Sequence, residues 1–191
     1  MSYVKIEGNA SGTGTFTIAA PNSNTDRVLT LPDEAGTVLT SASSITQNAG
    51  PAFSARMSSS QSISTGTATK VQFNTEFFDT DSCYDTSTYR FTPTVAGYYQ
   101  VNSGFFYNIV DTTGIDARIH VYKNGSNYKR AFFGFASPNA YYGCVISTAV
   151  YLNGSTDYIE IYTLQGSGSS QDLGNYGNAA DNWFDAYLIR A

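Results

Sequence analysis

The sequence predicts an all-β protein whose larger part is an antiparallel two-sheet sandwich or jelly roll. No segment combines the helical period with helix-forming residues. Instead, about eight to ten short segments of alternating apolar and polar residues, separated by turn residues, fill residues 52–191. Aromatic residues make up 15% of the 191 residues, and the 15 tyrosines favour strands over helices. Many short strands at this spacing are typical of sandwiches.

The longest predicted strand, residues 94–110, is the centre of this prediction. Read with a period of two, one face is apolar or small throughout, with Tyr99, Val101, Ser103, Phe105, Tyr107 and Ile109. The other face still carries Tyr98 and Phe106 among polar residues. We therefore expect a second sheet to cover the first face and another copy of the chain to cover part of the other.

The other strands of this region follow from the same alternation. In chain order they are residues 52–57, 69–73, 76–78, 115–123, 129–135, 141–152, 158–164 and 182–190, with residues 89–93 leading into the central strand. Asn124-Gly125 and Asn153-Gly154 are strong hairpin signals. Each is followed by Ser and so also matches the glycosylation acceptor pattern, but we interpret both as turns. Residues 166–177 are expected to form a polar loop.

Residues 1–39 differ from the rest of the chain. Gly-rich and turn-forming residues there separate two short alternating segments, 15–20 and 27–31. These carry too few apolar side chains for a core, so the module should be stable only against a neighbour or as a trimer. Residues 40–51 are rich in Ser, Thr, Asn and Gly and are read as a linker. The predicted organisation is thus a β module at 1–39, a linker at 40–51 and a head domain at 52–191.

Residues 9–39 resemble a known module. The pattern Gly-Asn-Ala-Ser-Gly-Thr-Gly-Thr-Phe-Thr-Ile-Ala-Ala-Pro, followed by Asp-Arg-Val-Leu-Thr-Leu-Pro-Asp-Glu-Ala-Gly-Thr-Val-Leu, is similar to a short module of bacteriophage tail-fibre and appendage proteins. The resemblance implies a structural role and does not say which appendage carries the chain. It also implies docking on other virion proteins and a location in the virion, after assembly in the host cytoplasm.

The head domain resembles the globular head of complement component 1q over nearly all of residues 51–191. The residues that carry the resemblance are Phe-Ser-Ala at 53–55, Phe-Thr-Pro-Thr-Val-Ala-Gly-Tyr-Tyr at 91–99, Lys-Asn-Gly at 123–125 and Trp-Phe-Asp-Ala-Tyr-Leu at 183–188. Two departures are Val101 for an aromatic residue and Asp185-Ala186 for Ser-Gly. The resemblance implies the ten-stranded jelly roll shared with tumour necrosis factor, and a compact homotrimer.

Adjacent apolar pairs point to the same trimer independently. Phe105 with Phe106, Cys144 with Val145, and Trp183 with Phe184 must project to opposite faces of their strands. Only one of each pair can face the core of the sandwich. The other should be covered by a neighbouring subunit. The candidate interface residues are Tyr98, Phe106, Tyr141, Val145, Trp183 and Tyr187. Arg118, His120 and Glu160 suggest that the second sheet has a solvated outer face.

Few residues suit catalysis or metal binding. His120 is the only histidine and should face solvent, so a Ser-His-Asp arrangement is not expected. Asp79, Asp81 and Asp85 resemble the start of a calcium loop, but Tyr84 replaces its glycine and Arg90 its bidentate glutamate. A loose calcium site and a plain turn capped by aspartates both remain open. Cys83 and Cys144 are either bridged or buried as free thiols. No catalytic residue and no cofactor is expected.

The charge and the distribution of apolar residues exclude two classes of function. The net charge of −5, with no run of Lys or Arg, argues against nucleic-acid binding. Neither a leader peptide nor a long apolar run is evident, so membrane insertion is not expected. The sequence therefore predicts a non-enzymatic phage virion protein, a trimeric tail-fibre or receptor-binding appendage that contacts host surface glycans or proteins. A capsid decoration trimer and a soluble lectin-like protein remain alternatives. The short chain without a shaft supports the capsid decoration trimer as an alternative to a fibre, and the N-terminal module argues against the soluble lectin-like protein. Residues 107–115, 137–141 and 165–176 have the composition of recognition loops.

Overall fold

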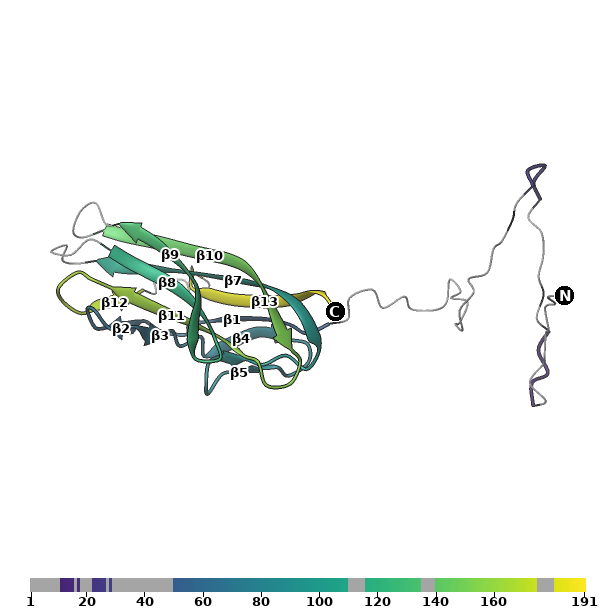
Figure 1. The fold of residues 1–191 in the computed structure, drawn as a ribbon, viewed down its shortest axis with the longest axis horizontal. Coiled ribbons are helices and arrows are strands. Elements are labelled where there is room, and N and C mark those ends of the chain that lie inside the picture. The colour runs from purple at the N-terminus through teal and green to yellow at the C-terminus, as the bar shows by residue number, and fades with distance from the viewer. Residues whose placement is uncertain are drawn as a thin grey trace. The chain divides into compact units, whose positions relative to one another are not determined.

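The computed structural model describes residues 11–15, 17, 22–26, 28, 50–109, 116–134, 140–174 and 181–191. The chain divides into two units, Met1–Ser44 and Ile45–Ala191. Most residues of the strands expected at 15–20 and 27–31, and most of the expected linker, lie outside the described residues. In the described part of the second unit every extended element is a β-strand, and no α-helix is present. The strands form two antiparallel sheets (Figure 1).

The first sheet is organised around the longest strand, β7. Its order is β2-β12-β7-β13-β1-β4, and β10 pairs with the other edge of β7. The strands are β1 (Ala52–Arg56), β2 (Gln61–Ile63), β4 (Thr75–Asp79), β7 (Ala96–Ile109), β10 (Ala140–Asn153), β12 (Gln171–Leu173) and β13 (Trp183–Arg190). β7 and β10 pair over their full lengths, from Ala140 opposite Ile109 to Asn153 opposite Ala96. Among the described strands, β10 pairs with β7 alone, so it forms an edge of the sheet.

The second sheet has the order β5-β6-β11-β8-β9, and the short β3 also pairs with β11. The strands are β3 (Thr69–Lys70), β5 (Tyr84–Asp85), β6 (Arg90–Phe91), β8 (Asp116–Lys123), β9 (Ser126–Gly134) and β11 (Ile159–Gln165). β9 pairs only with β8 and therefore lies at the edge.

The alternation in β7 is confirmed. Tyr99, Val101, Ser103, Phe105 and Tyr107 are at most 2% exposed and face the second sheet. Ala117, Ile119 and Val121 alternate along β8 and are fully buried in the core. Aromatic rings fill one end of the core, where Phe53 stacks on Tyr84 at 4.4 Å and meets Phe184 edge-on at 4.8 Å. Such ring pairs stabilise the core beyond the area they bury.

The expected loop at 166–177 contains the strand β12, and the strand β2 lies in a segment where no strand was predicted. Gln171 and Leu173 are buried while Asp172 between them is exposed, which is a minimal alternation. Because β12 is held by pairing to β2 and to the end of β7, it depends on partners far away in sequence. The expected strand at 69–73 shortens to β3.

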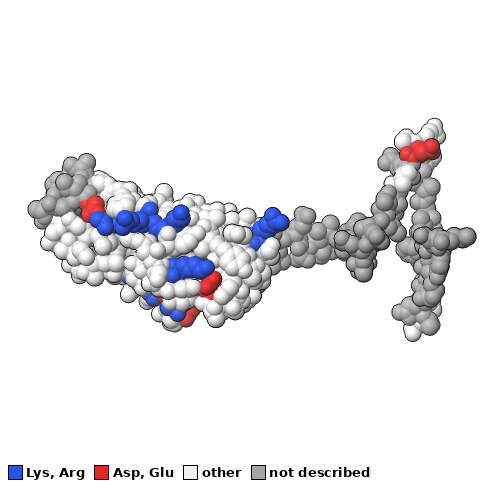
Figure 2. Space-filling model, in the orientation of Figure 1, with Lys and Arg blue, Asp and Glu red and all other residues white. Residues whose placement is uncertain are grey.

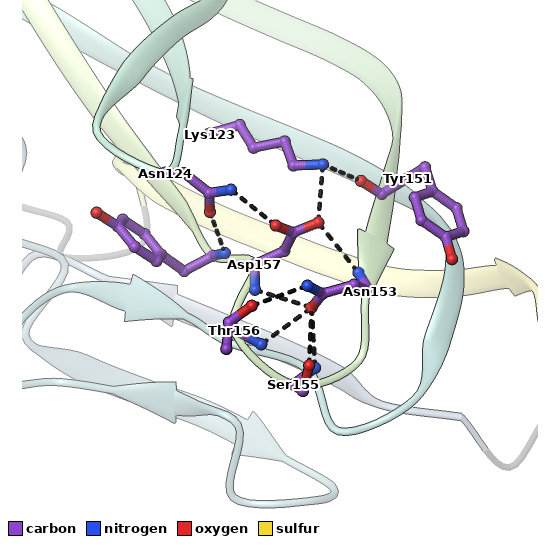
Figure 3. A network of polar contacts seen from close by, with 8 residues as sticks. Lys123, Asn124, Tyr151, Asn153, Ser155, Thr156 and Asp157 are labelled. Atoms are coloured by element: carbon purple, nitrogen blue, oxygen red, sulfur yellow. Dashed lines mark hydrogen bonds and ion pairs between the residues drawn. The ribbon is translucent and has the colours of Figure 1, made fainter.

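Both Asn-Gly pairs lie in turns, as predicted. Asn124 and Gly125 have φ values of 52° and 75°, and the turn joins β8 to β9. Positive φ at both central residues matches the right-handed twist of a two-residue hairpin. In the turn that follows β10, the Oδ1 atom of Asn153 accepts hydrogen bonds from the backbone N–H groups of Ser155, Thr156 and Asp157. Figure 3 shows how the Asp157 carboxylate links the two turns by accepting hydrogen bonds from Asn124 and the Asn153 backbone.

Charged side chains occupy few places on the surface. Asp, Glu, Lys and Arg make up 13% of the chain, and most of the face seen in Figure 2 is uncharged.

Cys83 and Cys144 are both buried free thiols, so the bridged alternative is wrong. Among the described residues, no helix has the length and apolar character needed to cross a membrane.

Candidate assembly face

The six predicted interface residues lie on one face of the first sheet. Tyr98 and Phe106 belong to β7, Tyr141 and Val145 to β10, and Trp183 and Tyr187 to β13. Five of them neighbour a buried residue of the same strand, such as Phe105, Cys144 or Phe184, and Tyr141 neighbours Tyr142, which packs against the core, so each points away from the core. We call this surface the assembly face and define it by these six residues.

These side chains are accessible in a single subunit. Val145 is 69% exposed, and Tyr98, Tyr141 and Tyr187 are each about half exposed. Phe106 and Trp183 are partly buried. Isolated exposed apolar side chains are normal on proteins, but a contiguous group on one sheet marks a binding surface.

A shallow apolar hollow of about 470 Å³ lies within the assembly face. Its walls include Phe106, Tyr141, Val145 and Trp183, and the rings of Phe106 and Tyr141 meet edge-on at 5.8 Å. Gly104 shapes the floor of this hollow because it has no side chain. A Cβ atom at this position would approach the Trp183 ring to 3.0 Å. The Trp183 indole therefore lies flat against the sheet instead of standing up from it.

A polar row crosses the assembly face. Asn102 of β7 accepts a hydrogen bond from Ser147 of β10 and lies opposite Asp185 of β13. Asp185 in turn lies opposite Ser54 of β1. The Oδ1 atom of Asp185 is buried with no hydrogen-bond partner among the described residues. Burial raises the pKa of this carboxyl group, and a hydrogen bond from Ser54 opposes the rise.

The structure adds apolar residues that the sequence argument missed. Tyr151 of β10 is 48% exposed and meets Tyr98 edge-on at 5.5 Å. Ile189 of β13 is 42% exposed and follows Tyr187 by two positions. The alternation that placed Val145 extends to Tyr151 and could have found it, whereas Ile189 lies at a register shift between Leu188 and Arg190, which period two does not predict. Phe78 of β4, 51% exposed, lies beside a register shift between Ser54 and Ala55, which period two does not predict.

The expectation of a solvated outer face on the second sheet is wrong for two of its three residues. His120 and Glu160 point away from the core but are only 4% and 2% exposed. Lys70 Nζ lies 2.6 Å from the Glu160 carboxylate, and Arg90 lies 2.9 Å from it, so the buried charge is paired. Arg118 is partly exposed. Side chains from neighbouring strands cover this face, and the sequence of one strand does not show them.

The aspartates of the suggested calcium loop cap turns. Asp79 accepts hydrogen bonds from the backbone N–H groups of Asp81 and Tyr84. Asp85 accepts from the side chains of Ser87 and Thr88, which lower its pKa to about 2. In the described residues no group of three or more His, Cys, Asp or Glu side chains is arranged to hold a metal ion.

Both thiols are buried, and the Cys83 thiol donates a hydrogen bond to the Asp79 carboxylate. Burial raises the pKa of both Cys83 and Cys144 to about 12, and for Cys83 the nearby Asp79 carboxylate adds to the rise. Thiolate is the nucleophilic form, so neither cysteine is suited to catalysis at neutral pH.

No protein-family model matches the sequence, and no curated protein does. Similarity appears at the level of structure. The chain is similar to Eiger TNF from S. frugiperda, with a TM-score of 0.56 and 10% identity over 73% of this chain and 91% of that one. It is also similar to murine APRIL at pH 8.0, with a TM-score of 0.54 and 12% identity over 73% of this chain and 98% of that one. At these identities the likeness concerns the fold alone. The second unit is therefore an all-β, antiparallel jelly roll of the tumour necrosis factor type.

Proposed function

We propose that the protein is the non-enzymatic subunit of a homotrimer that assembles through the assembly face. The observation that carries this proposal is the exposure of aromatic and aliphatic side chains on three adjacent strands of one sheet. Burying roughly 600 Å² of such surface in each subunit would contribute about 15 kcal/mol before the costs of association. The resemblance of the head domain to the complement component 1q head also supports a trimer.

The trimer would also bury the polar row. A carboxyl oxygen without a partner, such as Oδ1 of Asp185, is unfavourable in a dry interface. Three copies related by a threefold axis present three such groups, which can meet donors of neighbouring subunits such as the Gln100 amide or the Ser54 hydroxyl. The row would then fix the orientation of the subunits, while the apolar residues supply most of the binding energy.

We further propose that this trimer is a bacteriophage virion protein, a tail-fibre or receptor-binding appendage. The support is the resemblance of residues 9–39 to phage appendage modules, which would dock on other virion proteins. The head is suited to display. β1 begins with Ala52 opposite Tyr187, near the end of β13 (Figure 1). The strands that flank the candidate recognition loops end at the other end of the sandwich, where Ile109 faces Ala140 and Leu173 faces Tyr107.

Two experiments test these proposals separately. Sedimentation equilibrium of the purified chain should give three times the mass of one subunit at micromolar concentration, and a monomer would contradict the assembly proposal. Immunogold labelling of intact phage particles should place the protein on the tail. Labelling of the shell would favour a capsid decoration protein, and the absence of label combined with binding on a glycan array would favour a soluble lectin.

A further inference from the structure

The strands of the second sheet carry most of the Lys and Arg residues of the chain, and four of these, Lys70, Arg90, Arg118 and Arg130, point to its outer face. Six of the ten Lys and Arg residues lie on its strands, namely Lys70, Arg90, Arg118, Lys123, Lys129 and Arg130. Figure 2 shows Lys and Arg in a row over β8 and β9, although the net charge of the chain is −5. A local concentration of cations on an acidic protein attracts anionic ligands to one place.

Two of these cations converge on one aromatic ring. The guanidinium carbons of Arg118 and Arg130 each lie 4.9 Å from the centre of the Phe132 ring. The two guanidinium carbons are therefore no more than about 10 Å apart. Arg118 is also paired with Asp116, whereas Arg130 has no ion pair among the described residues. The cluster thus keeps an excess of positive charge.

A buried imidazole without hydrogen bonds lies beside these cations. His120 is opposite Arg130 across the β8–β9 pair, and Arg118 is opposite Phe132 in the same register, so all four side chains share one face. His120 is only 4% exposed, and neither ring nitrogen has a hydrogen-bond partner among the described residues. The Asn127 side chain interacts with the ring, and this interaction raises the pKa of His120 against the lowering by burial. Buried polar atoms in native proteins are almost always paired, so the imidazole keeps the capacity to hydrogen-bond a ligand.

We propose that Arg118, Arg130 and His120 form a binding site for a tetrahedral oxyanion, a sulfate or phosphate monoester carried by a saccharide. Guanidinium groups bind such anions through paired charge-assisted hydrogen bonds. Arg130 is exposed and lies opposite His120 across the β8–β9 pair. The imidazolium then donates the third hydrogen bond. The two arginines supply attraction, and the histidine supplies a donor whose presence depends on pH.

All charged and titratable neighbours of the imidazole act on its protonation. These are Arg118 and Tyr122 on β8, Arg130 on β9, Glu160 and Tyr162 on β11, and Lys70 on β3 beyond Tyr162. Without a ligand, burial lowers the pKa of His120, and Arg130 and Arg118 lower it further. Glu160 does not offset them, because Lys70 and Arg90 pair with it. A bound anion reverses the field at the ring and stabilises the imidazolium, so binding takes up a proton and strengthens as pH falls.

The site does not depend on the proposed trimer. It lies on the sheet opposite the assembly face, and all its residues come from β8 and β9 of one subunit. It would give the protein an affinity for sulfated or phosphorylated surface polysaccharide on the side of the head as well as at its loops. Failure of trimerisation would leave this site intact, and failure of this site would leave the trimer intact.

The single histidine makes the test direct, because its ring protons give an NMR signal that needs no assignment. The titration midpoint of His120 is measured on the full chain with sodium sulfate, and with sodium chloride at equal ionic strength. Sulfate does not titrate in this range. The midpoint should lie below the ordinary value of about 6.5 in chloride and rise by about one pH unit in sulfate, a tenfold gain in proton affinity. Equal midpoints in the two salts would overturn the proposal.

Variants separate a defined site from general attraction. Arg130→Gln should weaken sulfate binding about tenfold, since it removes one charge-assisted pair. Lys129→Gln is the matched control, because it removes the same charge from the next residue of β9, and it should change binding less than twofold. Equal losses in the two variants would show diffuse electrostatic attraction and contradict the site. Sulfated, phosphorylated and neutral forms of one oligosaccharide then distinguish the source of the oxyanion, and equal binding of the neutral form would also contradict the proposal.

Discussion

Replacing Val145 by aspartate tests the assembly face at its most exposed apolar residue. Val145 is 69% exposed in one subunit and lines the apolar hollow. Burying the remainder of this side chain is worth about 1 kcal/mol in each subunit, hence about 3 kcal/mol in a trimer. An unpaired carboxylate in its place costs at least about 2 kcal/mol more per subunit, hence about 6 kcal/mol in a trimer. A total near 9 kcal/mol corresponds to a roughly millionfold weaker trimerisation constant.

The assay is sedimentation velocity over a range of concentrations, combined with thermal unfolding. We expect the wild-type chain to sediment as a trimer at micromolar concentration and Val145→Asp as a folded monomer. Ser126→Asp is the control, because it adds the same charge at an exposed position of the second sheet and should remain trimeric. The argument fails if Val145→Asp stays trimeric, or if the wild-type chain is a stable monomer with this face open to water.

Four further predictions concern stability and reactivity. Glu160→Gln should lower the free energy of unfolding by about 2–3 kcal/mol in urea titrations, because two partly exposed cations lose their buried counter-charge; an unchanged midpoint would refute this. Asn153→Ala should cost about 1–2 kcal/mol in the same assay, since three backbone N–H groups lose their acceptor, and a loss as small as that of a typical surface substitution would count against it. Cys83 and Cys144 should react with a thiol reagent at pH 8 only after unfolding, because burial raises their pKa to about 12; immediate reaction of the native protein would contradict their burial. In the absence of sulfate, stability should fall as pH drops below about 6.5, because the unfolded chain binds a proton at His120 more tightly than the folded one, and His120→Gln should remove this part of the pH dependence.

The fold was predictable because period-two alternation is a local property. β7 shows this most clearly, since its inward residues could be read from the sequence and are buried as predicted. The short strands β2 and β12 were not predictable, because each is only three residues long and is held by pairing with distant segments. The turn at Asn124-Gly125 was predictable because its backbone conformation favours these two residues.

The candidate site was only partly predictable for the same reason. The alternation of the sequence predicts which side chains point away from the core, and all six predicted interface residues do so. It does not predict which side chains of other strands pack over a residue on the outer face of a sheet. His120 is outward on β8, yet its environment is set by Arg130 on β9 and Tyr162 on β11, on either side of it. Such cover depends on the register between strands, which the sequence of one strand does not contain. The proposed oxyanion site therefore emerges only from the structure.

The pairing of β1 with β13 makes the head a good candidate for circular permutation. Ala52 at the start of β1 lies opposite Tyr187 near the end of β13, so a short peptide linker could join the two strands. New ends could then be opened at the exposed Asn124-Gly125 turn, where no core side chain is lost. In this circular permutant, an attached module would be joined to the head domain at the β8–β9 hairpin instead of at β1. It would thereby show whether the direction of attachment matters to the protein.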